Sequence, residues 1–202
     1  NYLRRLNEFA WDFSRKPPSR ISLMRHRGKQ LAIELRFLGL LARFVAFFGL
    51  EQKLENRVES LMLSYDRSSE AEIRMSTERP EAVLVTGPFQ FKQPAVAAAA
   101  KKLGIPTIAF IPSWDNLSTK NRMVLNYDGY LVWNETSRNE LHYFYPETQG
   151  KPVYVVGAPQ FDAFFNESFF QSREEFCLQQ GLNPGLPIIV YAVGSPNFLV
   201  EH

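Results

Sequence analysis

Four short apolar segments in the middle of the chain each end in a cluster of Gly, Pro, Ser, Asp or Asn. They read EAVLVTGP (81–88), PTIAFIPSWDN (106–116), DGYLVWNE (128–135) and VYVVGAPQFD (153–162). The intervals between them are long enough for helices, which is typical of a parallel sheet with helices on its faces. Ligands of such sheets bind outside the carboxyl ends of the strands. The polar and aromatic residues after each segment are therefore the candidate site.

The same pattern predicts the other elements. The predicted strands are 82–86, 106–111, 129–133, 153–156 and 187–193. The first predicted helix is 2–13, which ends before Pro17 and Pro18, and a long helical region follows over 20–63 with breaks near Gly39 and Gly49. Segment 67–79 is a polar helix or loop. Further helices are predicted over 93–103 and over 136–145, the second capped by Asn134 or Thr136, and 159–181 is a linker with a short helix.

These elements predict an α/β fold with a Rossmann-like parallel sheet, flanking helices and a helical N-terminal region. We expect four parts, namely a helical region over 1–79, a Rossmann-like domain over 80–165, an interdomain linker over 166–185 and the start of a second α/β domain over 186–202. The chain has no initiator Met and stops soon after a predicted strand, so we expect it to be part of a longer protein.

Segment 30–50 approaches the length of a membrane span, but Glu34, Arg36 and Arg43 lie within it. Three charges in hydrocarbon would cost several kcal/mol, so we exclude a span. A buried helix is the first interpretation. A helix on the membrane surface and a partner interface remain alternatives.

Charge is distributed unevenly along the 202 residues, whose net charge is +2. Residues 1–50 contain 10 Lys and Arg against 3 Asp and Glu, and residues 51–202 contain 13 against 18. The basic first quarter suits anionic partners such as lipid headgroups, phosphates or nucleic acid, or it is a pair of helices with solvated basic faces. It lacks a recognisable nucleic-acid-binding module, so we expect no nucleic acid partner.

Several chemistries lose support from the composition. Cys177 is the only cysteine, which excludes an internal disulfide, and its helical context favours a buried thiol. The three histidines do not have metal-ligand spacing, and we expect no metal. The chain has no G-x-x-x-x-G-K-[ST], G-x-G-x-x-G or G-x-S-x-G motif, so NTPase, dinucleotide oxidoreductase and serine hydrolase functions are disfavoured.

The segment SWDNLSTK (113–120) is the strongest candidate site. Asp115 and Asn116 can hydrogen-bond hydroxyls, Trp114 offers an apolar plate to a sugar, and Lys120 can meet a phosphate. The alternative is a turn that caps the next helix, with Trp114 as a hydrophobic anchor. Weaker candidates follow the other predicted strands. They are Gly87, Trp133, Asn134, Gly157, Asp162, Gly194 and Ser195.

The segments SWDNLSTK, DGYLVWNE and GAPQFD, in this order, resemble the N-terminal domains of a group of GT-B-type glycosyltransferases. This group builds surface carbohydrates and is distantly similar to CDP-glycerol glycerophosphotransferases. The resemblance covers 80–165 well and is faint before it. It implies two Rossmann-like domains that face a cleft, with a nucleotide-sugar as co-substrate and no bound metal or other cofactor.

The resemblance also implies roles for individual residues. Ser113, Trp114, Asp115 and Asn116 would line the cleft from the acceptor side, and Asp115 is the candidate for the general base that the reaction needs. Gly157, Phe161 and Asp162 would lie where the chain crosses between domains, and Gly194 and Ser195 would meet the donor phosphate.

We therefore expect the acceptor-side part of a glycosyltransferase that acts on a surface-glycan or membrane-linked acceptor, inactive as this chain alone. Its expected location is cytoplasmic, peripheral to the inner face of the membrane through 20–50. A polyol-phosphate transferase of the CDP-glycerol type and a non-catalytic glycan-binding domain are the alternatives.

Overall fold

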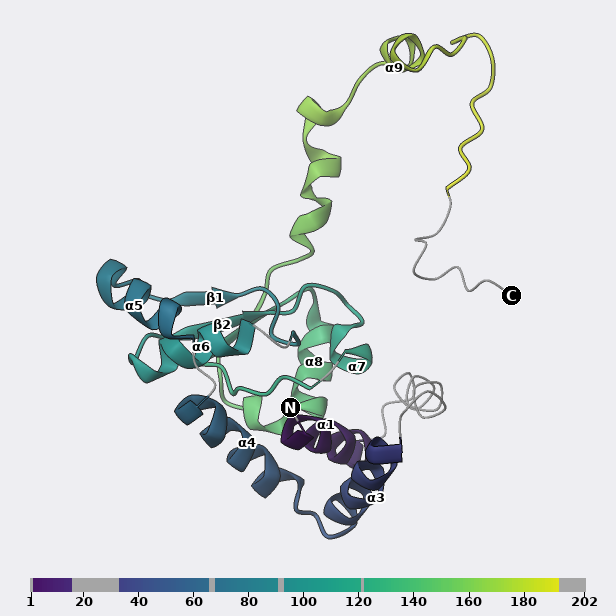
Figure 1. Ribbon diagram of the computed structural model, residues 1–202. Coiled ribbons are helices and arrows are strands. Elements are labelled where there is room, and N and C mark those ends of the chain that lie inside the picture. The colour runs from purple at the N-terminus through teal and green to yellow at the C-terminus, as the bar shows by residue number, and fades with distance from the viewer. Residues whose placement is uncertain (1, 16–32, 66–67, 91–92, 121, 193–202) are drawn as a thin grey trace. The chain divides into compact units, whose positions relative to one another are not determined.

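The computed structural model describes residues 2–15, 33–65, 68–90, 93–120 and 122–192. The chain forms two compact units, Asn1–Pro159 and Gln160–His202, which are described separately (Figure 1).

The first unit contains a parallel sheet of four strands. The strands are β1 (Val83–Val85), β2 (Thr107–Phe110), β3 (Gly129–Val132) and β4 (Val153–Val155), and they lie in the order β1-β2-β3-β4. All three pairings are parallel, so the carboxyl ends of the four strands share one edge. This confirms the predicted α/β class and the first four predicted strands. Because the spatial order follows the sequence, the described strands contain no reversal of the kind that marks a doubly wound switch point.

Two connecting helices cover one face of this sheet. They are α6 (Gln93–Lys102) and α8 (Glu135–Phe144), and Figure 1 shows them on the same side. Their apolar side chains share one core with Val85, Ala109 and Tyr130. Right-handed crossovers between consecutive parallel strands return on the same face, which explains the one-sided arrangement. On the opposite face Leu84 and Tyr154 are exposed. The predicted parallel sheet with flanking helices is confirmed.

Among the described residues, four further helices precede the sheet. They are α1 (Tyr2–Arg15), α3 (Ile33–Phe47), α4 (Glu51–Tyr65) and α5 (Ser69–Glu78). The predicted helix over 2–13 is confirmed, and the predicted polar segment 67–79 is helical. The break at Gly49 is confirmed by its positive φ of 61°, but α3 continues through Gly39, where a break was predicted. Pro17 and Pro18 lie outside the described residues.

The second unit contains the 3-10 helices η2 (Pro159–Phe165) and η3 (Glu167–Phe169), followed by helix α9 (Arg173–Gln180). Ser172 and Glu175 form a capping box at the start of α9, and Cys177 is buried as predicted. The predicted strand over 187–193 is wrong for its described part, since 187–192 has no strand structure. A strand needs a neighbour for its backbone N–H and C=O groups, and no described segment pairs with these residues.

Candidate functional site at the carboxyl edge of the sheet

The loop that follows β2 holds the carboxylate of Asp115 in a fixed position. Ser113 Oγ donates to Asp115 Oδ1 at 2.7 Å, and Asn116 Nδ2 donates to the same oxygen at 3.2 Å. Thr119 Oγ1 donates to Asp115 Oδ2 at 3.1 Å. These contacts lie at the start of the short helix α7 (Asn116–Thr119), whose backbone receives no capping bond from the Asp115 side chain. The loop is therefore organised around the carboxylate itself.

These contacts also set the charge of Asp115. Partial burial alone would raise the pKa of Asp115, but the hydrogen bonds from Ser113 and Thr119 and the positive charge of Lys120 outweigh it and lower the pKa. The carboxylate is therefore charged at neutral pH and ready to accept hydrogen bonds. A lowered pKa also makes it a weaker base, so its predicted role as general base stays a prediction.

Trp114 is 66% exposed, although it lies between two partly buried residues. The alternative that Trp114 anchors the loop in the hydrophobic core is therefore wrong. Asn116 and Leu117 are buried instead and hold the loop against the sheet. The indole of Trp114 is therefore an exposed apolar ring, and the residue that follows it carries the fixed carboxylate.

Gly87, at the end of β1, is buried and close to two glutamine side chains. Its N–H donates to Gln93 Oε1 at 2.6 Å, and a Cβ on Gly87 would lie 2.8 Å from Gln90 Cδ and 2.9 Å from Gln93 Cδ. Gly87 thus makes room for the protein's own side chains. Gln93 was not identified from the sequence as a partner of Gly87. Its position in the first turn of α6 was the one feature that could have indicated this contact.

The ends of β3 and β4 are joined by backbone contacts. The Gly157 N–H donates to the Trp133 carbonyl at 3.1 Å, and Gly157 has a φ of 76°. Asn134 Oδ1 accepts from the Ser137 N–H at 2.8 Å and caps α8. Gly87, Ser113, Asp115, Trp133, Asn134 and Gly157 therefore follow strands that end at one edge, as predicted.

The remaining predicted site residues belong to the second unit or lie outside the described residues. Phe161 and Asp162 belong to the second unit, and Gly194 and Ser195 are outside the described residues. Among the residues that the structure describes, no three His, Cys, Asp or Glu side chains are grouped to hold a metal ion.

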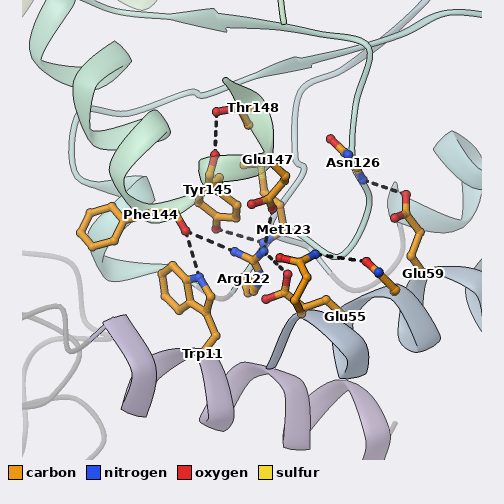
Figure 2. A network of polar contacts seen from close by, with 12 residues as sticks. Trp11, Glu55, Glu59, Arg122, Met123, Asn126, Phe144, Tyr145, Glu147 and Thr148 are labelled. Carbon is orange, nitrogen blue, oxygen red and sulfur yellow. Dashed lines mark hydrogen bonds and ion pairs between the residues drawn. The ribbon is translucent and has the colours of Figure 1, made fainter. Parts of the chain in front are cut away.

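A second polar cluster surrounds Arg122, and the sequence did not predict it (Figure 2). Arg122 is 3% exposed, and its Nη2 lies 2.6 Å from Glu55 Oε2 and 2.7 Å from Glu147 Oε1. Its guanidinium carbon lies 4.5 Å from the ring centroid of Tyr145 and 5.4 Å from that of Trp11. Burial alone would lower the pKa of Arg122, but the two carboxylates outweigh it and raise the pKa.

A cavity of about 30 Å³ lies beside Arg122, lined by polar groups that include Asn7, Glu59 and Asn126. The Asn7 Oδ1 and Arg122 Nε atoms are buried without a hydrogen-bond partner. A space of this size suits one or two ordered water molecules and is too small for a sugar ring. This cluster therefore joins elements together, and the edge of the sheet remains the candidate functional site.

No protein-family model, curated protein or solved structure matches this chain. The geometry at the edge of the sheet therefore carries the functional argument.

Proposed function

We propose that this chain is the acceptor-side part of a GT-B-type glycosyltransferase, which transfers a sugar from a nucleotide-sugar donor to a surface-glycan or membrane-linked acceptor. Two observations carry the proposal: the indole of Trp114 is exposed, and the carboxylate of the next residue, Asp115, is held in place by hydrogen bonds. A sugar presents an apolar C–H face and a ring of hydroxyl groups. An exposed aromatic ring and a charged hydrogen-bond acceptor in consecutive residues can meet both features.

In this proposal Asp115 takes the proton of the acceptor hydroxyl as that oxygen attacks the anomeric carbon of the donor sugar. A new C–O glycosidic bond forms while the bond between the anomeric carbon and the phosphate oxygen breaks. The nucleoside diphosphate leaves with the bonding electron pair. Ser113 and Thr119 would hold the carboxylate toward the acceptor.

A glycan-binding domain without catalysis is the second candidate. The lowered pKa of Asp115 favours it, because a carboxylate stabilised by several donors accepts hydrogen bonds well and takes up protons poorly. The two candidates share the same sugar-binding surface and differ in turnover.

The test is an assay of the full-length protein with a panel of nucleotide sugars, comparing Asp115→Asn with Asp128→Asn. Asp128 is a matched control at the opposite edge of the sheet. Its Oδ2 accepts from Thr107 N at 2.8 Å and from Thr107 Oγ1 at 2.9 Å. Partial burial alone would raise its pKa, but these bonds lower it, as they do for Asp115.

We expect Asp115→Asn to lower kcat by about 10²-fold or more, as for loss of a general base, and Asp128→Asn to leave kcat unchanged. Equal kcat for Asp115→Asn and wild type would remove Asp115 as the base. Glycan binding without turnover for any donor would favour the second candidate. The absence of both turnover and glycan binding would contradict the proposal. Thermal stabilisation by CDP-glycerol and not by nucleotide sugars would favour the polyol-phosphate alternative.

A further inference from the structure

Helix α3 has an exposed apolar face. Six large apolar side chains lie three or four residues apart over α3 and the turn that follows it, which places them on one side of the helix. They are Phe37, Leu40, Leu41, Phe44, Phe47 and Phe48, and all six are exposed. This set is called the α3 outer face below.

The opposite side of α3 is also apolar and is already occupied. Ala42 is fully buried in a small core with Leu6 and Ala10 of α1, and Leu38 and Val45 pack against that core. A helix on the surface of a protein normally turns polar side chains to solvent. Because α3 is apolar on both sides, its first interpretation as a buried helix is wrong for the outer face. A contiguous apolar surface of this kind marks an interaction site.

The charged residues on α3 and in the sequence on either side of it indicate which partner binds the α3 outer face. Between Asp12 and Glu51 the sequence contains eight Lys and Arg residues and one carboxylate, Glu34. Arg43 is exposed on α3 itself, with its guanidinium carbon 5.2 Å from the ring centroid of Phe13. The apolar face therefore belongs to a strongly basic part of the chain, and a basic, apolar helix surface is typical of helices that lie in the headgroup region of anionic membranes.

We propose that the α3 outer face binds the surface of an anionic phospholipid membrane, with its aromatic side chains among the lipids and the exposed Arg43 at the headgroups. A second copy of the chain fits less well, because both copies carry the same excess of basic residues in the sequence between Asp12 and Glu51. The membrane would be bound without being crossed: among the described helices, none is long and apolar enough for a span. The inference rests on α3 and on the basic sequence between Asp12 and Glu51, and it does not depend on catalysis at the sheet.

The experiment is co-sedimentation of the whole chain with vesicles of phosphatidylcholine, with and without phosphatidylglycerol. One variant is Phe37→Ser/Phe47→Ser, which changes side chains of α3 that are 69% and 83% exposed. Its matched control is Ile73→Ser/Tyr65→Ser, which changes side chains of α5 and α4 that are 69% and 85% exposed. Since all four residues are exposed, neither variant removes part of the core.

We expect wild type and the control to sediment with phosphatidylglycerol vesicles, and salt to weaken this binding. The α3 variant should bind at least about tenfold more weakly. Absence of wild-type binding, or equal binding by the two variants, would overturn the proposal. A change from dimer to monomer in the α3 variant, without lipid binding by wild type, would assign the face to a second copy instead. Circular dichroism of both variants checks that they are folded.

Discussion

Arg122 is a buried cation, and protein groups make the interactions that water would make with an exposed guanidinium. Removing a guanidinium from water is costly, and the carboxylates of Glu55 and Glu147 repay this cost only while all three groups are present. The rings of Trp11 and Tyr145 add cation–π contacts in the same place. The cluster also joins parts of the chain that are far apart, because Glu55 lies on α4 and Glu147 follows α8.

The positive charge of Arg122 should contribute to the stability of the fold. Arg122→Met should lower the free energy of unfolding by about 3–5 kcal/mol, because it leaves two carboxylates without their buried partner. Urea denaturation followed by circular dichroism measures this change. Arg74→Met is the control, since the Arg74–Glu78 pair on α5 has a similar separation of 2.8 Å but is exposed. A loss from Arg122→Met no larger than that of the control would contradict a stabilising role for the cluster.

Helix α8 begins at a side-chain cap. The sequence left Asn134 and Thr136 as alternative caps, and the structure assigns the cap to Asn134 through its 2.8 Å contact with the Ser137 N–H. Thr136 is exposed within the helix.

Asn134→Ala should therefore destabilise the protein by about 1 kcal/mol, and Asn134→Asp should keep most of this stability. Thr136→Ala should change the midpoint of urea denaturation far less, because it removes no cap. Equal losses from Asn134→Ala and Thr136→Ala would mean that the assigned cap is wrong.

The strands and helices between 82 and 156 could be predicted because their patterns are local. Each strand is a short apolar segment that ends at a turn-forming residue, and each following helix has a start or stop signal, such as Pro94 in the first turn of α6 or Gly104 after its end. The position of the loop around Asp115 could be predicted because this loop directly follows a predicted strand.

Features that depend on distant partners could not be predicted. The segment 187–192 has a strand-like composition but no pairing partner among the described residues. Gly39 lowers helix propensity, yet contacts of Leu38 and Ala42 with α1 keep α3 continuous. The Arg122 cluster could not be predicted because Arg122 belongs to no recognisable sequence motif. Its partners come from helices that are distant from it in sequence.

At the scale of the first unit, the N-terminal helices and the sheet form one body. Trp11 Nε1 donates to the Phe144 carbonyl at 3.1 Å, Arg4 Nη2 donates to the Gln90 carbonyl at 2.9 Å, and the Asn126 N–H donates to Glu59 Oε1 at 3.0 Å. These contacts attach α1 and α4 to segments around the sheet. We propose that the carboxyl edge of the sheet and the α3 outer face contact other molecules.

We propose that the carboxyl edge of the sheet binds a glycan. The three tryptophans of the chain allow a direct test of this proposal. Trp114 and Trp133 follow strands at this edge, whereas Trp11 is buried in the Arg122 cluster with its indole N–H bonded to Phe144. Each tryptophan gives one indole N–H signal in a ¹H–¹⁵N spectrum, and single Trp→Phe variants assign the three signals. The measurement is a titration of the whole chain with a panel of oligosaccharides and nucleotide sugars.

We expect at least one of these sugars to shift the Trp114 signal saturably, with a smaller shift at Trp133 and none at Trp11. No saturable shift at Trp114 with any member of the panel, or a shift confined to Trp11, would contradict the claim.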